Sequence, residues 1–331
     1  MHIQFDTNVD VVGMCQEKQF LVVGERSGNF HLIHIPSKQT LLTKILVEKS
    51  SSEKTYLNLF IEKDNADAGV YHMFILTSNG FFCIMCLPLA KTQEAIDKMD
   101  MVTAKKLQGQ IKTAFISTEE YHSLGCQNFV ISNSVNKIHL IIGGKGDYVL
   151  SKWEVDTTNN LVSLRSFADS SLIKDAAKLQ VLDNLLFVLD TENILSMWDV
   201  YSLTLIWDWP LIHIEEFLLS TESDSSPVIW QGLANVKLIV MTIPDNKQMR
   251  SLMVFALPTM QLLYSLEVSI VSSLVQSGIS TDTIYFLEGI HEKHQLPSEG
   301  PVSVVVMRSL TEALPENRLS RLLHKHQFTE A

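Results

Sequence analysis

The chain has 331 residues, with 26 Lys and Arg against 37 Asp and Glu, which gives a formal net charge of −11. Hydrophobic residues make up 46% of the chain and charged residues 19%, so a sizeable core can form and a globally disordered chain is excluded. The acidic balance disfavours nucleic acid as a partner, because phosphate backbones attract cationic surfaces.

The four cysteines are Cys15, Cys83, Cys86 and Cys126. They are too few for a disulfide scaffold at this length and fit a reducing compartment. Residues 1–20 lack the basic and apolar regions of a signal peptide. The most apolar run, Phe81 to Ala90, has about half the length that a membrane-spanning helix needs. These patterns predict a soluble intracellular protein without membrane insertion.

A unit of short strands and turns recurs along the chain. Its first copy is an apolar run at Phe20–Gly24, a turn ending in Gly28, a second run at Asn29–Ile35, and a further turn and run. Residues 184–209 repeat this order. The central turns of successive units are anchored at Gly28, Gly80, Gly146, Asn193, Asn246 and Gly300.

These anchors are spaced by 52, 66, 47, 53 and 54 residues. The longest spacing contains a segment, Ala90 to Gly109, with the apolar pattern of one helix at Ile96, Met99 and Leu107. Without those 20 residues, the spacing falls to 46. A period near 50 with four short strands predicts an all-β fold, a WD-like β-propeller with six recognisable blade units and one inserted helix.

The second run of each unit is continuously apolar, which predicts strands buried on both faces. The dipeptides Trp198-Asp199 and Trp153-Glu154 end third strands, as in many WD-type blades. The inserted helix has two equally weighted interpretations, a packing element and a docking element for a partner.

The two ends of the chain lie outside the repeat. Met1–Asp6 resembles the last strand of a preceding blade, so we expect an amino-terminally truncated propeller over residues 1–310 with one orphan strand. Either His2–Phe5 completes the last unit or the ring stays open, since that unit shows no fourth strand after Met307. Residues 311–331 carry an amphipathic helical pattern, Leu314 to Leu323, and are predicted to start a truncated α-solenoid.

Two short motifs invite a chemical interpretation. Cys83-x-x-Cys86 has the spacing of a metal or redox pair, but residues three apart on a strand point to opposite faces, which favours core packing. Gly143–Asp147 contains Gly-Gly-Lys-Gly, but no Ser or Thr follows the lysine, which favours a hairpin turn over a phosphate loop.

Histidine and tryptophan give further candidates. The segment His291–His294 is one residue short of a zinc-protease motif, and the pair His324 and His326 is predicted to be solvated. Blade packing is favoured over partner contact for the three tryptophans Trp207, Trp209 and Trp230. The sequence identifies no catalytic, cofactor-binding or metal-binding residue, and it leaves the partner-binding residues unknown.

Long irregular strings carry a family resemblance. Residues 183–210 read DNLLFVLDTENILSMWDVYSLTLIWDWP, and equally distinctive strings occupy residues 9–42, 104–126, 265–285 and 310–331. They resemble the amino-terminal region of the Rod (rough deal) kinetochore-associated family, essentially from end to end. The resemblance implies a β-propeller followed by an α-solenoid, the scaffold of the Rod–Zwilch–zeste-white-ten complex.

The resemblance further implies a non-enzymatic scaffold without cofactors. It would act at the outer kinetochore corona and spindle in mitosis, and would be cytoplasmic otherwise. Its propeller would dock Zwilch, and the full complex would support the spindle assembly checkpoint and recruit dynein–dynactin through Spindly. Three alternatives remain open: a truncated competitor of the full-length scaffold, a propeller enzyme with an axial site, and a coat or trafficking subunit.

Overall fold

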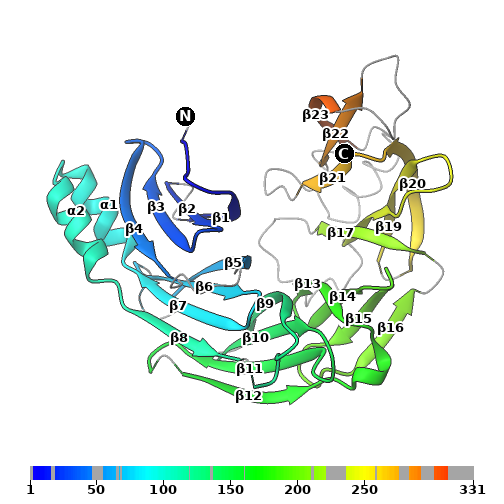
Figure 1. Cartoon of the computed structure of the whole chain (residues 1–331), viewed down its shortest axis with the longest axis horizontal. Helices are drawn as coiled ribbons and strands as arrows, with labels where there is room; N and C mark the ends of the chain where they lie inside the picture. The colour runs from blue at the N-terminus through cyan, green and yellow to red at the C-terminus, as the bar shows by residue number, and fades with distance from the viewer. Residues whose placement is uncertain are drawn as a thin grey trace, which may run out of the picture. The chain divides into compact units, whose positions relative to one another are not determined.

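The computed structural model describes residues 3–15, 19–46, 55–64, 67, 69–118, 120–134, 137–159, 161–209, 212–220, 236–257, 259–275, 283–291 and 302–311. Within these ranges the strands form six antiparallel sheets, five of four strands and one of three (Figure 1). In every sheet, strands that follow one another in the chain are neighbours. This meander is the arrangement of a propeller blade, so the predicted all-β propeller with six units is confirmed.

The chain divides into two compact units, the first comprising Met1–Glu192 and Ser196–Asp208. Its first sheet is β1 (Val9–Cys15), β2 (Phe20–Glu25), β3 (Asn29–His34) and β4 (Gln39–Ile45). Its second is β5 (Tyr56–Lys63), β6 (Tyr71–Thr77), β7 (Phe81–Leu87) and β8 (Thr113–Ser117). Its third is β9 (Cys126–Ser134), β10 (Lys137–Gly144), β11 (Leu150–Asp156) and β12 (Leu161–Phe167). A 3₁₀ turn, Ser170–Leu172, leads to the fourth: β13 (Ala176–Leu182), β14 (Leu185–Asp190), β15 (Leu195–Asp199) and β16 (Leu205–Trp209).

The second unit comprises Asn193–Leu195 and Trp209–Ala331. Its four-stranded sheet is β17 (Ile214–Ser220), β18 (Lys237–Thr242), β19 (Met249–Ala256) and β20 (Gln261–Ser269). Its three-stranded sheet is β21 (Ser272–Val275), β22 (Thr283–His291) and β23 (Val302–Thr311).

The insert between β7 and β8 consists of two helices, α1 (Leu89–Asp97) and α2 (Met101–Gly109), where the sequence predicts one. Met99 adopts a left-handed backbone (φ 59°), which ends the first helix. Asp100 then caps the second helix by accepting a 2.9 Å hydrogen bond from the Thr103 backbone N–H. The helices lie side by side next to β4 in Figure 1, and Gln108 Nε2 donates to Thr92 Oγ1 between them at 2.7 Å.

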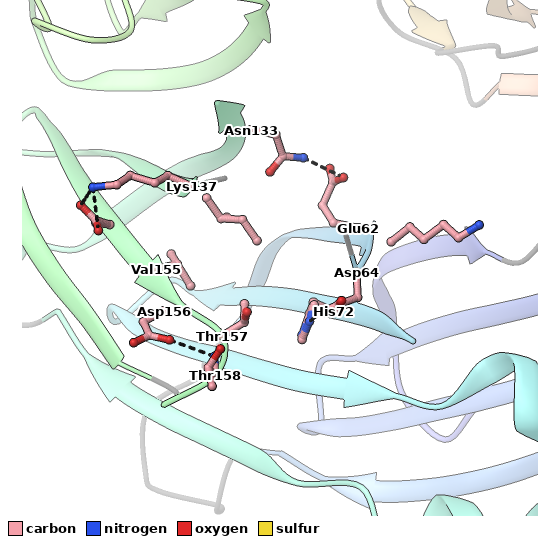
Figure 2. Close-up of a pocket in the computed structure, with 12 residues that line it drawn as sticks. Glu62, Asp64, His72, Asn133, Lys137, Val155, Asp156, Thr157 and Thr158 are labelled. Carbon is pink, nitrogen blue, oxygen red and sulfur yellow. Dashed lines mark hydrogen bonds and ion pairs between the residues drawn. The ribbon is translucent and has the colours of Figure 1, made fainter. Parts of the chain in front are cut away.

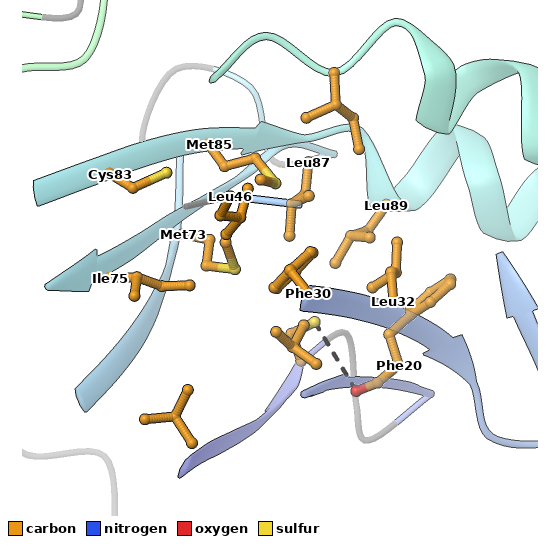
Figure 3. Close-up of a cluster of buried hydrophobic side chains, with 14 of the residues drawn as sticks. Phe20, Phe30, Leu32, Leu46, Met73, Ile75, Cys83, Met85, Leu87 and Leu89 are labelled. Atoms are coloured by element: carbon orange, nitrogen blue, oxygen red, sulfur yellow. Dashed lines mark hydrogen bonds between the residues drawn. The ribbon is translucent and has the colours of Figure 1, made fainter. Parts of the chain in front are cut away.

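Within the first unit, hydrophobic cores lie between neighbouring sheets. The core of the first two sheets contains Phe20 and Phe30 from one sheet and Met73 and Met85 from the other, each fully buried (Figure 3). Leu89, the first residue of α1, belongs to this core, so the insert is anchored where it leaves the sheet. Two further cores join the second sheet to the third and the third to the fourth.

The second strands of the first five sheets are buried almost throughout, as their continuous apolar runs predict. The sixth sheet differs. In β22, Ile284 and Phe286 are buried, but the alternating residues Tyr285 and Leu287 are only half-buried. The apolar run TIYFLE is therefore continuous in sequence but buried mainly on one face.

A β-bulge recurs at one position of the repeat. The pairing of the first and second strands skips one residue near the start of the first strand in four sheets: Asp10, Leu57, Ala177 and Glu215. At the first bulge, the Asp10 carboxylate accepts a hydrogen bond from the Arg26 side chain at 2.9 Å. It also accepts a 3.3 Å hydrogen bond from the backbone N–H of Tyr56 in the next sheet. Bulges that recur at equivalent positions are structural features of a repeat rather than defects.

The third and fourth sheets share a tryptophan–serine hydrogen bond. Trp153 Nε1 donates to Ser151 Oγ, and Trp198 Nε1 donates to Ser196 Oγ, each over 2.8 Å. In both cases the serine lies two residues before the tryptophan on the third strand, so the two side chains share one face. The two tryptophans predicted to end third strands are therefore buried with their indole N–H groups satisfied.

The predicted orphan strand over His2–Phe5 is not formed at residues 3–5. Instead, the Phe5 ring lies 5.5 Å from the His31 ring, and Thr7 donates two hydrogen bonds to Glu25, so this segment packs against the first sheet. The sixth sheet has three strands among the described residues, and the chain after Thr311 lies outside them. The predicted solenoid helix lies almost wholly outside the described residues, and the boundary at residue 310 stays a prediction.

Candidate interaction site

Cys83 and Cys86 lie on β7 with free thiols. Cys83 is buried, and burial raises the pKa of its thiol to about 12, whereas Cys86 is half-buried. No group of three or more His, Cys, Asp or Glu residues that could hold a metal occurs in the part of the chain that the structure describes. Core packing, which the spacing favours, is therefore found for Cys83, whereas Cys86 is only half-buried.

The segment Gly143–Asp147 forms the hairpin between β10 and β11, as predicted. Gly146 has a φ of +83°, which favours glycine, and Gly144 donates a 2.9 Å backbone hydrogen bond to Val149. A Cβ at Gly144 would lie 2.5 Å from His122 Nδ1, so the turn needs glycine to pass this buried ring.

The histidine candidates fall largely outside the described residues, since only His291, the last residue of β22, lies within them. Trp230 also lies outside. Trp207 is 60% exposed on β16, so the expectation that it packs within a blade is wrong for this residue. Trp209, two residues further along the strand, is half-buried.

The helical insert both packs and presents a surface. Leu89 belongs to the core of the first two sheets, and Thr92 and Ala104 are also buried. Met99, between the two helices, is 91% exposed, and Val102 on α2 is 79% exposed. Exposed apolar side chains on a rigid, anchored element are the usual material of a protein contact. The insert is therefore a candidate docking element that is held by the core of the sheets.

A pocket of about 390 Å³ lies between the second and third sheets, where β5, β9 and β11 end and β6 and β10 begin (Figure 2). Its lining carries four carboxylates, from Glu62, Asp64, Glu154 and Asp156. Two lysines and one histidine, Lys63, Lys137 and His72, complete its charged lining. The volume lies in the range of small-ligand pockets.

Three of the four pocket carboxylates are well partnered. Glu154 accepts hydrogen bonds from Arg165 at 2.9 Å and Lys137 at 3.2 Å, and these bonds lower its pKa. Asp156 accepts from the Asn159 side chain and from two backbone N–H groups of the following turn, which lowers its pKa. Asp64 bonds His72 Nε2 at 2.5 Å.

Glu62 is the exception. Burial raises its pKa, and its single described partner is the neutral amide of Asn133, which donates to Oε2 at 3.0 Å (Figure 2). Sequence reasoning missed this pocket, because its residues come from five separate strands and no local motif links them. Only the polar residues at the ends of otherwise apolar strands, such as His72 at the start of β6, carry a signal.

The fold defines the class of protein: a WD-like β-propeller. The chain is similar to the WD40 domain of SCAP from fission yeast (TM-score 0.55, 9% identity, 92% of this chain and 76% of that chain). It is also similar to BBS1N from a complex with ARL6DN (TM-score 0.55, 9% identity, 91% of this chain and 78% of that chain). At this identity the likeness shows the fold alone.

The model of the family "KNTC1, N-terminal" matches residues 1–312, so the chain belongs to this family. It is 59% identical to kinetochore-associated protein 1 of Homo sapiens over 334 aligned residues, and 57% identical to that of Mus musculus over 333. It covers 15% of the length of each of these relatives. The resemblance to the Rod kinetochore-associated family is therefore confirmed.

Proposed function

We propose that this chain is the propeller module of a kinetochore scaffold and that it acts by binding proteins rather than by catalysis. The observation that carries the proposal is its membership, over residues 1–312, in a family whose human and mouse members are named kinetochore-associated protein 1. The module docks Zwilch, and the whole scaffold, with the zeste-white-ten subunit, Spindly and dynein–dynactin, supports the checkpoint at the outer corona.

The insert is the surface that we assign to the docking. Its buried side is fixed by Leu89 and by the 2.7 Å hydrogen bond between Gln108 and Thr92, so its exposed side needs little ordering on binding. Met99 and Val102 present two large apolar side chains to solvent. Such side chains give their full burial energy only when a partner covers them.

Among the described residues, the arrangement that most resembles a catalytic site is a buried serine–histidine pair. His122 Nε2 lies 2.6 Å from Ser151 Oγ, but both residues are at most 1% exposed, and Ser151 Oγ also accepts the Trp153 hydrogen bond. A nucleophile must reach its substrate, so the pair supports a structural role. This favours the scaffold over the enzyme alternative.

Coexpression with Zwilch and size-exclusion chromatography test the proposal. The 331-residue chain is expected to elute with Zwilch, and the double change Met99→Asp and Val102→Asp is expected to release it. Leu172→Asp is the matched control, because Leu172 is 52% exposed in the turn after β12. No coelution of the folded wild-type chain would refute the docking proposal, and equal loss in the control would refute the assignment to the insert.

A chain that binds Zwilch without the rest of the scaffold would compete with the full-length protein. Overexpression in dividing cells tests this alternative. Loss of arrest in nocodazole would support a competitor, whereas normal arrest would count against it.

A further inference from the structure

We propose that the pocket between the second and third sheets is a receptor for a cationic side chain, an arginine or lysine of a partner segment, with Glu62 as its anchor. The inference goes beyond the proposed function and does not depend on Zwilch. It starts from the charges of the lining, where four carboxylates face two lysines.

The hydrogen bonds of the pocket single out Glu62. Glu154 and Asp156 are occupied by the donors described above, and Lys137 is already paired with Glu154 at 3.2 Å. Glu62 Oε2 accepts from Asn133, which leaves Oε1 without a described partner. A partly buried carboxylate with one neutral donor gains more from a charged donor than an exposed carboxylate does.

His72 forms part of the pocket wall. Its side chain is 8% exposed, its Nε2 lies 2.5 Å from Asp64 Oδ2, and its Nδ1 has no hydrogen-bond partner. With the proton on Nε2, which the contact with Asp64 favours, Nδ1 carries a lone pair. This Nδ1 is enclosed in the wall, so the acceptor that the described lining offers to a cation is Glu62 Oε1.

The partner chemistry follows from this set of acceptors. A phosphate or carboxylate ligand would face the carboxylates and is disfavoured. A guanidinium group is planar and presents five N–H donors, so it can pair with a carboxylate and still reach a second acceptor. The exposed hydroxyl of Thr158 at the pocket mouth adds a neutral contact for the backbone of the same segment.

Two tripeptides of nearly the same shape, one with a guanidinium and one with a neutral urea group, test the inference. Ac-Gly-Arg-Gly-NH₂ and Ac-Gly-citrulline-Gly-NH₂ are titrated into the 331-residue chain, and amide shifts are followed by ¹H–¹⁵N NMR. The arginine peptide is expected to shift the amides of residues 62–64 and 154–158 with millimolar affinity, and the citrulline peptide is expected to bind roughly tenfold more weakly. Equal shifts with both peptides, or none with arginine at about 10 mM, would overturn the proposal.

Glu62→Gln keeps the shape of the side chain and removes the charge, so arginine binding should fall roughly tenfold. Glu94→Gln is the matched control, since Glu94 pairs with Lys98 on the exposed face of α1. Unchanged arginine binding in folded Glu62→Gln would contradict the assignment of the anchor. The comparison of the two peptides on the wild-type chain decides the proposal even if that variant fails to fold.

Discussion

The Tyr56 hydroxyl of the second sheet donates a 2.8 Å hydrogen bond to the Gly28 carbonyl in the central turn of the first. Tyr56 is 5% exposed, and burial raises the pKa of its phenol. Its backbone N–H is held by Asp10 of the first sheet as well. One residue therefore joins two adjacent sheets through both its main chain and its side chain.

Tyr56→Phe should destabilise the chain by about 1 kcal/mol, because one buried hydrogen bond is lost while the ring packing is kept and the Gly28 carbonyl still accepts from the Leu46 backbone N–H at 3.0 Å. Urea unfolding followed by circular dichroism measures the change. Tyr201→Phe is the control, since Tyr201 is 58% exposed and its ring contact with Lys152 survives the change. Equal stability of the two variants would contradict the role of this bond.

Ser151→Ala should cost more than Ser196→Ala. Ser151 Oγ serves both Trp153 Nε1 and His122 Nε2, so its removal leaves two buried groups unpaired. Ser196 Oγ also has two partners, but only one of them, Trp198 Nε1, is a side-chain group, while the other is the backbone carbonyl of Val188 within the paired strand β14. Each unpaired buried group costs about 1–3 kcal/mol, so the expected difference is on the order of 1 kcal/mol. The same unfolding assay ranks the variants, and the opposite order would refute the argument.

Acid should weaken the fold through His122. Burial lowers its pKa from 6.5 to about 4, because the charged form of the ring would lose its hydration. The unfolded chain binds this proton below pH 6.5, whereas the folded chain binds it only near pH 4. The contribution to stability is therefore full above pH 6.5 and is lost as the pH falls to about 4, with a slope near 1.4 kcal/mol per pH unit.

His122→Gln should flatten this part of the pH profile while it keeps a polar group beside Ser151. Unfolding midpoints between pH 4 and pH 7 for the wild type and the variant give the comparison. A wild-type slope that persists unchanged in the variant would assign the acid sensitivity to other groups.

The thiols should differ in reactivity under native conditions. Burial raises the pKa of Cys15, Cys83 and Cys126 to about 12, so almost no reactive thiolate exists at neutral pH. Cys86 is half-buried, and although its pKa is also raised, it should be alkylated first. Mass spectrometry after brief N-ethylmaleimide treatment should find one label, which Cys86→Ser removes. Early labelling of Cys83 would contradict the burial of the second sheet.

The repeat could be predicted because each unit has a local signal. Gly28, Gly80 and Gly146 have positive φ angles in the central turns, and Asn193 takes the same conformation at 64°. The fifth turn shows the limit of this signal. Its left-handed residue is Gln248 rather than the predicted anchor Asn246, because Asp245 accepts three backbone N–H groups and shapes the turn around itself.

The insert and the pocket show what local signals miss. The helical pattern over Ala90–Gly109 does not reveal that the chain turns at Met99, since a left-handed backbone is uncommon for any residue other than glycine. The pocket joins Glu62 to Glu154 and Asp156 across two sheets. These three carboxylates come together only because whole strands pair and pack, and no local pattern in the sequence indicates it.

The insert leaves the pairing of its own sheet intact. β7 and β8 keep an unbroken register, from Phe81 opposite Ser117 to Met85 opposite Thr113, although two helices intervene in the chain. The length of this connection can therefore change without a shift in the β7–β8 pairing, provided that the buried anchor Leu89 is kept. The exposed surface of the insert, and with it the partner that the insert binds, can therefore change while the paired strands β7 and β8 stay the same.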